Sequence, residues 1–192
     1  MITNNDRAGW FGASDTSYVV GNYDTQSFAD WWGVKTGFIS NTYSSWAMKV
    51  GNIMEHQIVD HLNRLNRQGY GIKKGVNPVY RSHLRLRANY DGITRKELVE
   101  IKTSCKEFSK VPLNYWRQCQ VLMYATKRKK CVLWLYVLDV FDYQNPYFAN
   151  IDQDRLKRFD IDYDAEFIKN EYLPRVTYLA NCLRKGLFPC TQ

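Results

Sequence analysis

A short stretch of this sequence, LVEIK at residues 98–102, holds residue types that can do chemistry. Side chains of a strand alternate between its faces, so Glu100 and Lys102 point the same way, about 7 Å apart, while Val99 and Ile101 face a core. Asp91 comes before this stretch and next to a glycine, in a dipeptide typical of turns. If the resulting hairpin brings Asp91 near Glu100, the two carboxylates form a site for a hard cation such as Mg²⁺ or Mn²⁺. The adjacent lysine can position or help deprotonate an attacking water.

The D-x(8)-E-x-K pattern has a plainer interpretation, an exposed hairpin whose Glu–Lys pair adds little to stability. Two further polar residues favour the catalytic interpretation. Glu55 lies at the edge of an apolar stripe on a predicted helix, so its carboxylate faces inward and needs a partner. Gln120 lies between Trp116 and Tyr124 on the packing face of another predicted helix. This amide is either a satisfied core group or part of the site.

The chain has 192 residues, 45% of them apolar, and its 27 Lys and Arg outnumber 19 Asp and Glu to give a net charge of +8. This composition excludes a disordered chain and suffices for one hydrophobic core. The basic residues are grouped at Lys73–Lys74, Arg81–Arg87 and Lys127–Lys130. Such groups suit a phosphodiester substrate. We therefore expect an acidic, metal-filled centre within a basic rim, formed by the arginines before Ala88 and by Lys127–Lys130.

The elements that must position these residues follow from hydrophobic spacing. Helical periodicity predicts helices, and alternating or continuous apolar runs predict strands. The predicted helices cover 14–20, 25–34, 45–68, 112–127 and 164–185, the last interrupted near Pro174, and the predicted strands cover 83–88, 97–102 and 131–140. The first two strands are expected to pair antiparallel and the third to be central, covered on both faces. This order predicts an α/β fold, a central mixed β-sheet flanked by helices, in one domain with its core at 7–142 and a C-terminal helical extension at 143–192.

Other site classes find little support in the sequence. The five cysteines form no C-x-x-C pair, which indicates reduced thiols rather than a disulfide framework or a zinc site. The three histidines are scattered, and we interpret them as structural. No apolar run reaches the length of a membrane span, and the first six residues lack the apolar region of a signal peptide. We therefore expect a cytoplasmic protein.

Together these residues resemble the PD-(D/E)XK nuclease superfamily, whose core carries D…(D/E)-x-K on a strand hairpin between helices. Here that motif is Asp91, Glu100 and Lys102. The chain more closely resembles the lambda exonuclease and YqaJ-like viral recombinase branch, over about residues 7–142. Three more segments carry this resemblance: Arg7 followed by GWFGASD with Ser14, MKVGNIMEHQI with Glu55, and YWRQCQVLMYAT with Tyr115, Gln118, Gln120 and Met123.

The resemblance implies a restriction-endonuclease-like fold and a Mg²⁺-dependent nuclease, with Mn²⁺ as a substitute. It implies a phage-type 5′→3′ exonuclease that degrades double-stranded DNA from a free end during recombination, in the cytoplasm of a host cell. It also implies a ring-like homo-oligomer and a single-strand annealing protein as a partner. The expected metal ligands are Asp91, Glu100, the Ile101 carbonyl and Glu55; the expected catalytic residues include Lys102 and Gln120; the expected DNA or phosphate contacts are Arg7, Ser14, Gln118, Arg85 and Arg87.

Two alternatives stay open at this point. The first is a restriction-type or repair endonuclease on the same fold, and a closed circular duplex distinguishes it, because an exonuclease needs an end. The second is a catalytically inactive DNA-binding protein, and metal binding distinguishes it. Some relatives also carry a further acid upstream of the motif aspartate, whereas residues 79–90 contain none.

Overall fold

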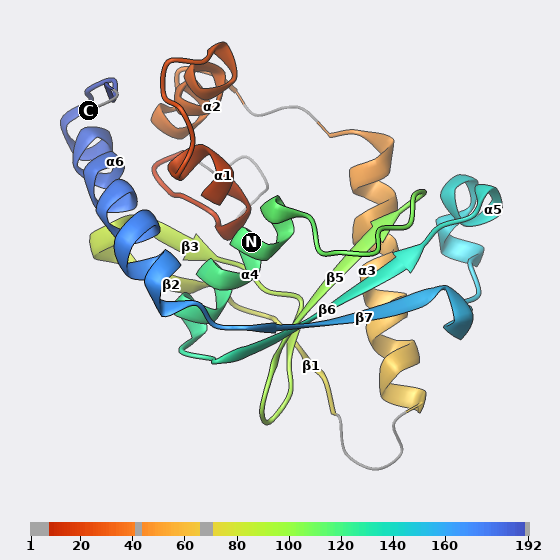
Figure 1. The fold of residues 1–192 in the computed structure, drawn as a ribbon. Helices are drawn as coiled ribbons and strands as arrows, with labels where there is room; N and C mark the ends of the chain where they lie inside the picture. The colour runs from red at the N-terminus through yellow and green to blue at the C-terminus, as the bar shows by residue number, and fades with distance from the viewer. Residues whose placement is uncertain (1–7, 41–43, 66–70, 191–192) are drawn as a thin grey trace.

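The computed structural model describes residues 8–40, 44–65 and 71–190 (Figure 1). Its centre is a five-stranded mixed sheet in the order β1-β4-β5-β6-β7. Strands β5 and β6 are parallel, and the other neighbours are antiparallel. The strands of this sheet are β1 (Lys73–Lys74), β4 (Gly92–Ile93), β5 (Leu98–Ser104), β6 (Lys130–Val137) and β7 (Leu156–Asp162).

Strand β6 shows how the core is divided. Its Leu133 and Leu135 side chains enter one core cluster, while Tyr136 enters a second cluster on the opposite face, with Trp134 packed against it. Helix α4 (Leu113–Thr126) covers the first face, and helix α3 (Trp46–Leu65) covers the second (Figure 1). The prediction of a central strand covered on both faces is therefore confirmed, and so is the mixed sheet flanked by helices.

The remaining elements of the N-terminal part lie on the α4 side of the sheet. They share one core with α4, in which the rings of Phe11, Phe28, Trp31 and Trp32 pack against one another. These elements are η1 (Ala13–Asp15), α1 (Thr16–Val19), α2 (Gln26–Thr36) and a small sheet of β2 (Val79–Arg81) and β3 (Leu86–Ala88). The structure thus confirms the predicted helices at 14–20, 25–34, 45–68 and 112–127, within a few residues at each end among those described.

The strand predicted at 83–88 is wrong over its first half. Residues Ser82–Leu84 form a 3-10 turn (η2), and Arg85 follows it in the left-handed region with φ of 52°. Only β3 is extended, and it pairs with β2 rather than with β5. With this turn, Leu84 and Leu86 both enter the core on the α4 side. A continuous strand with the same alternation would bury the same two leucines. Alternation alone could not reveal it.

The C-terminal part is more than the expected helical extension. Strand β7 pairs antiparallel with β6 over its whole length, so this part of the chain completes the sheet. Ile161 is its one buried residue, and this edge strand carries too little apolar sequence to be recognised. The other elements of this part are α5 (Val140–Gln144), η3 (Pro146–Phe148), η4 (Gln153–Arg155), a π-helical segment η5 (Phe167–Tyr172) and α6 (Leu173–Lys185). The helix predicted at 164–185 is present, but it is not broken near Pro174: η5 continues directly into α6, and only the type of helix changes there.

The five cysteines are free thiols, of which Cys119, Cys131 and Cys182 are buried. This agrees with the prediction of reduced thiols. Among the helices described, none combines the length and the apolar character that a membrane crossing requires.

We predict that Leu133→Ala lowers the free energy of unfolding by about 3 kcal/mol, because it leaves a cavity in the centre of the sheet. Leu133 is fully buried, whereas Val140 on α5 is 72% exposed. The matched control, Val140→Ala, should change stability by about 0.5 kcal/mol or less. Urea unfolding followed by circular dichroism measures both, and equal losses for the two variants would contradict this assignment of the core.

Candidate active site

The site begins where β5 loses its antiparallel neighbour. Strand β4 pairs only Ile93 with Leu98 and Gly92 with Val99, and it then diverges. Continuing this register places Asp91 opposite Glu100. Its Oδ2 accepts a hydrogen bond from the backbone N–H of Ile101 at 2.6 Å. The Asp91 side chain therefore accepts the hydrogen bond that a backbone carbonyl would accept if β4 continued to pair with β5.

The turn of this hairpin is not at Asp91–Gly92, as predicted, but after β4. Thr94 closes it, because its hydroxyl oxygen accepts bonds from the N–H groups of Lys96 and Glu97 at 3.2 and 3.0 Å. Gly92 instead allows close packing of β1, since a Cβ there would lie 2.5 Å from Cγ2 of Ile72. Ordinary antiparallel pairing, without a bulge, thus brings Asp91 to Glu100.

Glu100 is 2% exposed and lies at the centre of the site. Its Oε1 accepts two hydrogen bonds, from Lys102 Nζ at 2.7 Å and from Gln118 Nε2 at 2.5 Å. Its Oε2 is buried without a hydrogen-bond partner among the described residues. A buried carboxylate oxygen without a partner is costly unless a cation binds it, so Glu100 has one ligand atom available for a metal.

Lys102 is the cation of the site. Burial by itself lowers the pKa of Lys102, but the carboxylates of Glu100 and Asp91 outweigh burial and raise that pKa above its ordinary value. Its Nζ also lies 5.4 Å from the centroid of the Tyr115 ring, so the aromatic face adds to the stabilisation of the charge. Lys102 therefore remains an ammonium group at neutral pH.

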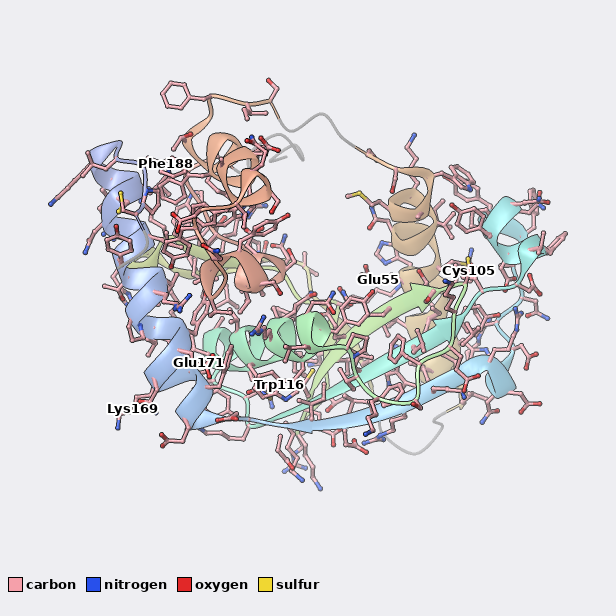
Figure 2. The ribbon with its side chains drawn as sticks, turned by 45° about the horizontal axis from the view of Figure 1, so that its top comes forward. Glu55, Cys105, Trp116, Lys169, Glu171 and Phe188 are labelled. Carbon is pink, nitrogen blue, oxygen red and sulfur yellow. The ribbon has the colours of Figure 1, made fainter. Side chains whose placement is uncertain are left out.

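The neighbouring acids repel one another. Burial raises the pKa of Asp91 well above its ordinary value, and the carboxylates of Glu100 and Glu55 raise it further. Burial also raises the pKa of Glu55, and the Glu100 carboxylate adds to the effect against the opposing influence of His56. Glu55 lies on the side of α3 that faces the N-terminal helices (Figure 2). Perturbed carboxylates that converge in this way are typical of functional sites.

These residues fit a divalent cation in their chemistry. Asp91 and Glu100 are hard oxygen donors, and the N–H and C=O of one strand residue point to the same edge, so the Ile101 carbonyl faces the Asp91 side. Within the described part of the chain, no three Asp, Glu, His or Cys side chains lie close enough together to form a metal-binding group by themselves. Glu55 is thus near the pair but is not grouped with it as a third ligand.

All of these groups line one cavity of about 540 Å³. Its wall includes the predicted residues Ser14, Glu55, Arg87, Asp91, Glu100, Ile101, Lys102 and Gln118. The cavity lies between α3, the exposed edge of β5 and the N-terminal segment before α1. The topology therefore brings together residues that are nearly 90 positions apart, from Ser14 to Lys102.

Sequence reasoning missed a buried ion pair in the same wall. Lys35 Nζ lies 2.5 Å from Asp15 Oδ2, and the two side chains are 3% and 10% exposed. Trp31 Nε1 donates to the other carboxylate oxygen at 3.0 Å, and the Gly12 N–H donates to Oδ2 at 2.6 Å. The signal was available, because Lys35 follows Trp31 by one helical turn and so lies on the apolar face of α2, as Glu55 does on α3.

The predicted role of Gln120 is wrong. Its Nε2 donates to the Asp162 carbonyl at 2.9 Å, and its Oε1 accepts from the Asp164 N–H at 2.7 Å. Its amide is therefore a satisfied core group that joins α4 to the end of β7, and it does not line the cavity. Gln118, two positions earlier on α4, contacts the Glu100 carboxylate instead.

The basic residues are distributed differently from the prediction. Lys35 and Arg87 line the cavity, whereas Arg85 and Lys127–Lys130 do not. The Arg85 guanidinium lies over the Trp10 ring at 5.8 Å instead. The basic run at 127–130 ends at Lys130, the first residue of β6, about 17 Å along the strand from the residue that pairs with Lys102. Arg7 lies outside the described residues.

A known protein family covers the part of the chain that forms this site. The family described as "YqaJ-like viral recombinase domain" matches residues 4–129, which include every residue of the cavity wall. No curated protein matches the sequence.

Solved structures of similar fold include an alkaline exonuclease, LHK-Exo from Laribacter hongkongensis. It superposes with a TM-score of 0.70 at 18% identity, over 94% of this chain and 90% of that one. A phage-related exonuclease from Haemophilus somnus 129PT superposes with a TM-score of 0.65 at 13% identity, over 92% of this chain and 96% of that one. At these identities the likeness concerns the fold alone, and it confirms the restriction-endonuclease-like core.

We predict that Gln120→Leu lowers the free energy of unfolding by about 2 kcal/mol, because the Asp162 carbonyl and the Asp164 N–H lose their buried partner. Gln118→Leu should cost less stability, since Lys102 still bonds Glu100. Thermal unfolding of both variants measures the difference. A larger loss for Gln118→Leu would contradict the structural role given to Gln120.

The metal-free protein should become more stable when Asp91 is replaced by asparagine. Asp91→Asn removes a buried charge that burial, Glu100 and Glu55 all disfavour, while its amide oxygen can still accept from Ile101. We expect a gain of about 1 kcal/mol at pH 8 in EDTA. Because the pKa of Asp91 is raised on folding, its charge costs stability above that pKa, so the gain should shrink as the pH falls. A constant gain from pH 5 to pH 8 in urea unfolding would contradict this origin.

Proposed function

This chain belongs to the family of YqaJ-like viral recombinase domains, and from that premise we propose that it is a metal-dependent deoxyribonuclease. One observation carries the proposal. The buried Glu100 carboxylate keeps one oxygen without a partner while its other oxygen binds Lys102, beside the second acid Asp91. A purely structural carboxylate would have both oxygens satisfied.

We propose Asp91, Glu100 and the Ile101 carbonyl as ligands of a divalent cation, preferably Mg²⁺, with Mn²⁺ as a substitute. When bound, the cation supplies positive charge that offsets the negative charge developing on the phosphate and on the leaving oxygen. Glu55 lies in the same wall, where its carboxylate can bind or orient a water or a second cation.

The residues of the chain then divide the remaining work. Glu100 holds the Lys102 ammonium at 2.7 Å, and Gln118 holds Glu100 from α4, so the three side chains fix one another. Lys102 remains protonated, and its ammonium can donate to an attacking water and orient it toward phosphorus. Ser14 and Arg87 line the cavity and can donate to phosphate oxygens. Arg7 stays a predicted phosphate contact.

Within this activity, we favour a phage-type exonuclease that digests double-stranded DNA 5′→3′ in recombination. LHK-Exo and the Haemophilus somnus protein, whose folds are similar, bear the name exonuclease, and LHK-Exo has also been solved in complex with dAMP. The ring-like homo-oligomer, the single-strand annealing partner and the host-cell cytoplasm stay predictions. So does the organisation as one nuclease domain.

We predict that Lys102→Ala abolishes Mg²⁺-dependent DNA degradation, which corresponds to a fall in kcat of about 1000-fold or more, while DNA binding persists. The ammonium acts in the reaction, whereas Ser14, Arg87 and the metal ligands still contact the substrate. Release of acid-soluble nucleotides and a filter-binding assay measure the two properties, with Val140→Ala on α5 as the control. Wild-type turnover in Lys102→Ala would overturn the mechanism.

Digestion of end-labelled linear duplex and of closed circular duplex, with Mg²⁺ and with EDTA, decides between the alternatives. We expect the linear DNA alone to be degraded, with Mg²⁺ only, and with mononucleotides released from the 5′ end. Cleavage of the closed circle would instead identify an endonuclease. DNA binding without Mn²⁺ binding in calorimetry and without cleavage would identify an inactive DNA-binding protein.

A further inference from the structure

A second set of side chains at the cavity has no part in this mechanism. Trp10 lines the cavity wall, next to Phe11, Gly12 and Ser14. The edge of the Tyr80 ring meets Trp10 at a centroid distance of 5.1 Å and an interplanar angle of 71°. The guanidinium of Arg85 lies 5.8 Å from the centroid of the Trp10 ring. We call Trp10, Tyr80 and Arg85 the Trp10 cluster.

The backbone holds the Trp10 cluster in place at the surface. The Phe11 N–H donates to the Arg85 carbonyl at 2.7 Å, and the Arg87 N–H donates to the Phe11 carbonyl at 2.8 Å. Phe11 is fully buried, so the adjacent Trp10 projects to the other side of this extended segment. Tyr80 is 40% exposed, and Trp10 and Arg85 are both partly exposed. Two aromatic rings and a cation are thus fixed beside a cavity without being needed in the core.

We propose that the Trp10 cluster is a stacking site for unpaired nucleobases of the DNA end. This inference rests on the proposed function, because it places the cluster on the path of a DNA substrate. Aromatic rings stack on bases of any sequence, and a guanidinium adds cation–π attraction and charge toward the backbone. A nuclease that removes nucleotides without sequence preference needs such sequence-tolerant contacts.

The distance between the cluster and the acids suits this role. Phe11 forms a bridge with Leu86, and five residues of nearly extended chain lead from Leu86 to Asp91. This path spans at most about 17 Å. At about 3.4 Å per stacked nucleotide, this corresponds to roughly five nucleotides or fewer. A strand whose phosphate lies at Asp91 and Glu100 therefore has bases within reach of Trp10.

The inference is tested with DNA that carries the fluorescent base 2-aminopurine in a single-stranded overhang. Lys102→Ala protein, which should bind without cutting, is titrated with this DNA, and the same protein also carrying Trp10→Ala, Trp10→Phe, Tyr80→Ala or Trp46→Ala is compared. We expect binding to quench the fluorescence, and Trp10→Ala to remove the quenching and weaken affinity about tenfold. Trp10→Phe should retain most of both, and Tyr80→Ala should weaken affinity by a smaller factor.

Trp46 is the matched control, because it is 45% exposed on α3 and does not line the cavity. Trp46→Ala should bind and quench as the parent protein does. Circular dichroism melting shows whether Trp10→Ala is folded, and the Phe and Tyr80 variants keep the test valid if it is not. Unchanged quenching and affinity in folded Trp10→Ala and in Tyr80→Ala would overturn the inference.

Failure of the proposed function gives a different result. In that case wild-type protein does not cut the linear duplex with Mg²⁺, whether or not it binds the DNA. If it does cut, but 2-aminopurine responds equally in the duplex and in the overhang, the cluster does not select unpaired bases and the inference alone is wrong.

Discussion

The structure around the site depends on the burial of Glu100, which sits 2% exposed between a lysine, a glutamine and a second acid. A carboxylate in that position is stable only if its charge is offset and its oxygens are bonded. Lys102 and Gln118 do so for Oε1 alone, which leaves Oε2 as an open ligand position. The buried Oε2 without a partner lowers the stability of the metal-free protein, and a bound cation would restore that stability. Such a local loss of stability is common at functional sites.

The second constraint is the short β4. If it continued to pair with β5, the N–H of Ile101 would bond another backbone and no space would remain for substrate. Because the pairing stops at Gly92, Asp91 supplies the missing acceptor through its side chain, and the edge of β5 opens toward α3. The pairing therefore ends at Gly92, and the site begins at the adjacent Asp91. The edge of β5 that β4 leaves unpaired beyond Val99 is thus part of the candidate binding site.

Much of this could be read from the sequence, and the exceptions have physical causes. The period of apolar residues identified the long helices and β6, because burial on one or both faces determines those patterns. It could not show the turn at Ser82–Leu84, which buries the same leucines as a strand would, or β7, whose residues are mostly charged. The inward acid Glu55 was found on an apolar face, whereas Lys35 carried the same signal and was overlooked. For Gln118 and Gln120, only the rotation of α4 decides which amide faces Glu100.

The sign of the cavity's formal charge depends on whether a cation is bound. The charged residues that line it, among those described, are the acids Asp15, Glu55, Asp91 and Glu100 and the bases Lys35, Arg87 and Lys102. Four acids and three bases leave it one negative charge, although the whole chain carries +8. One divalent cation at Asp91 and Glu100 reverses that sign. A phosphate would therefore enter against a repulsive field in the metal-free protein and along an attractive one after loading. The surplus of basic residues outside the cavity can draw DNA to the molecule in either state, but only the loaded cavity favours a phosphate at the acids.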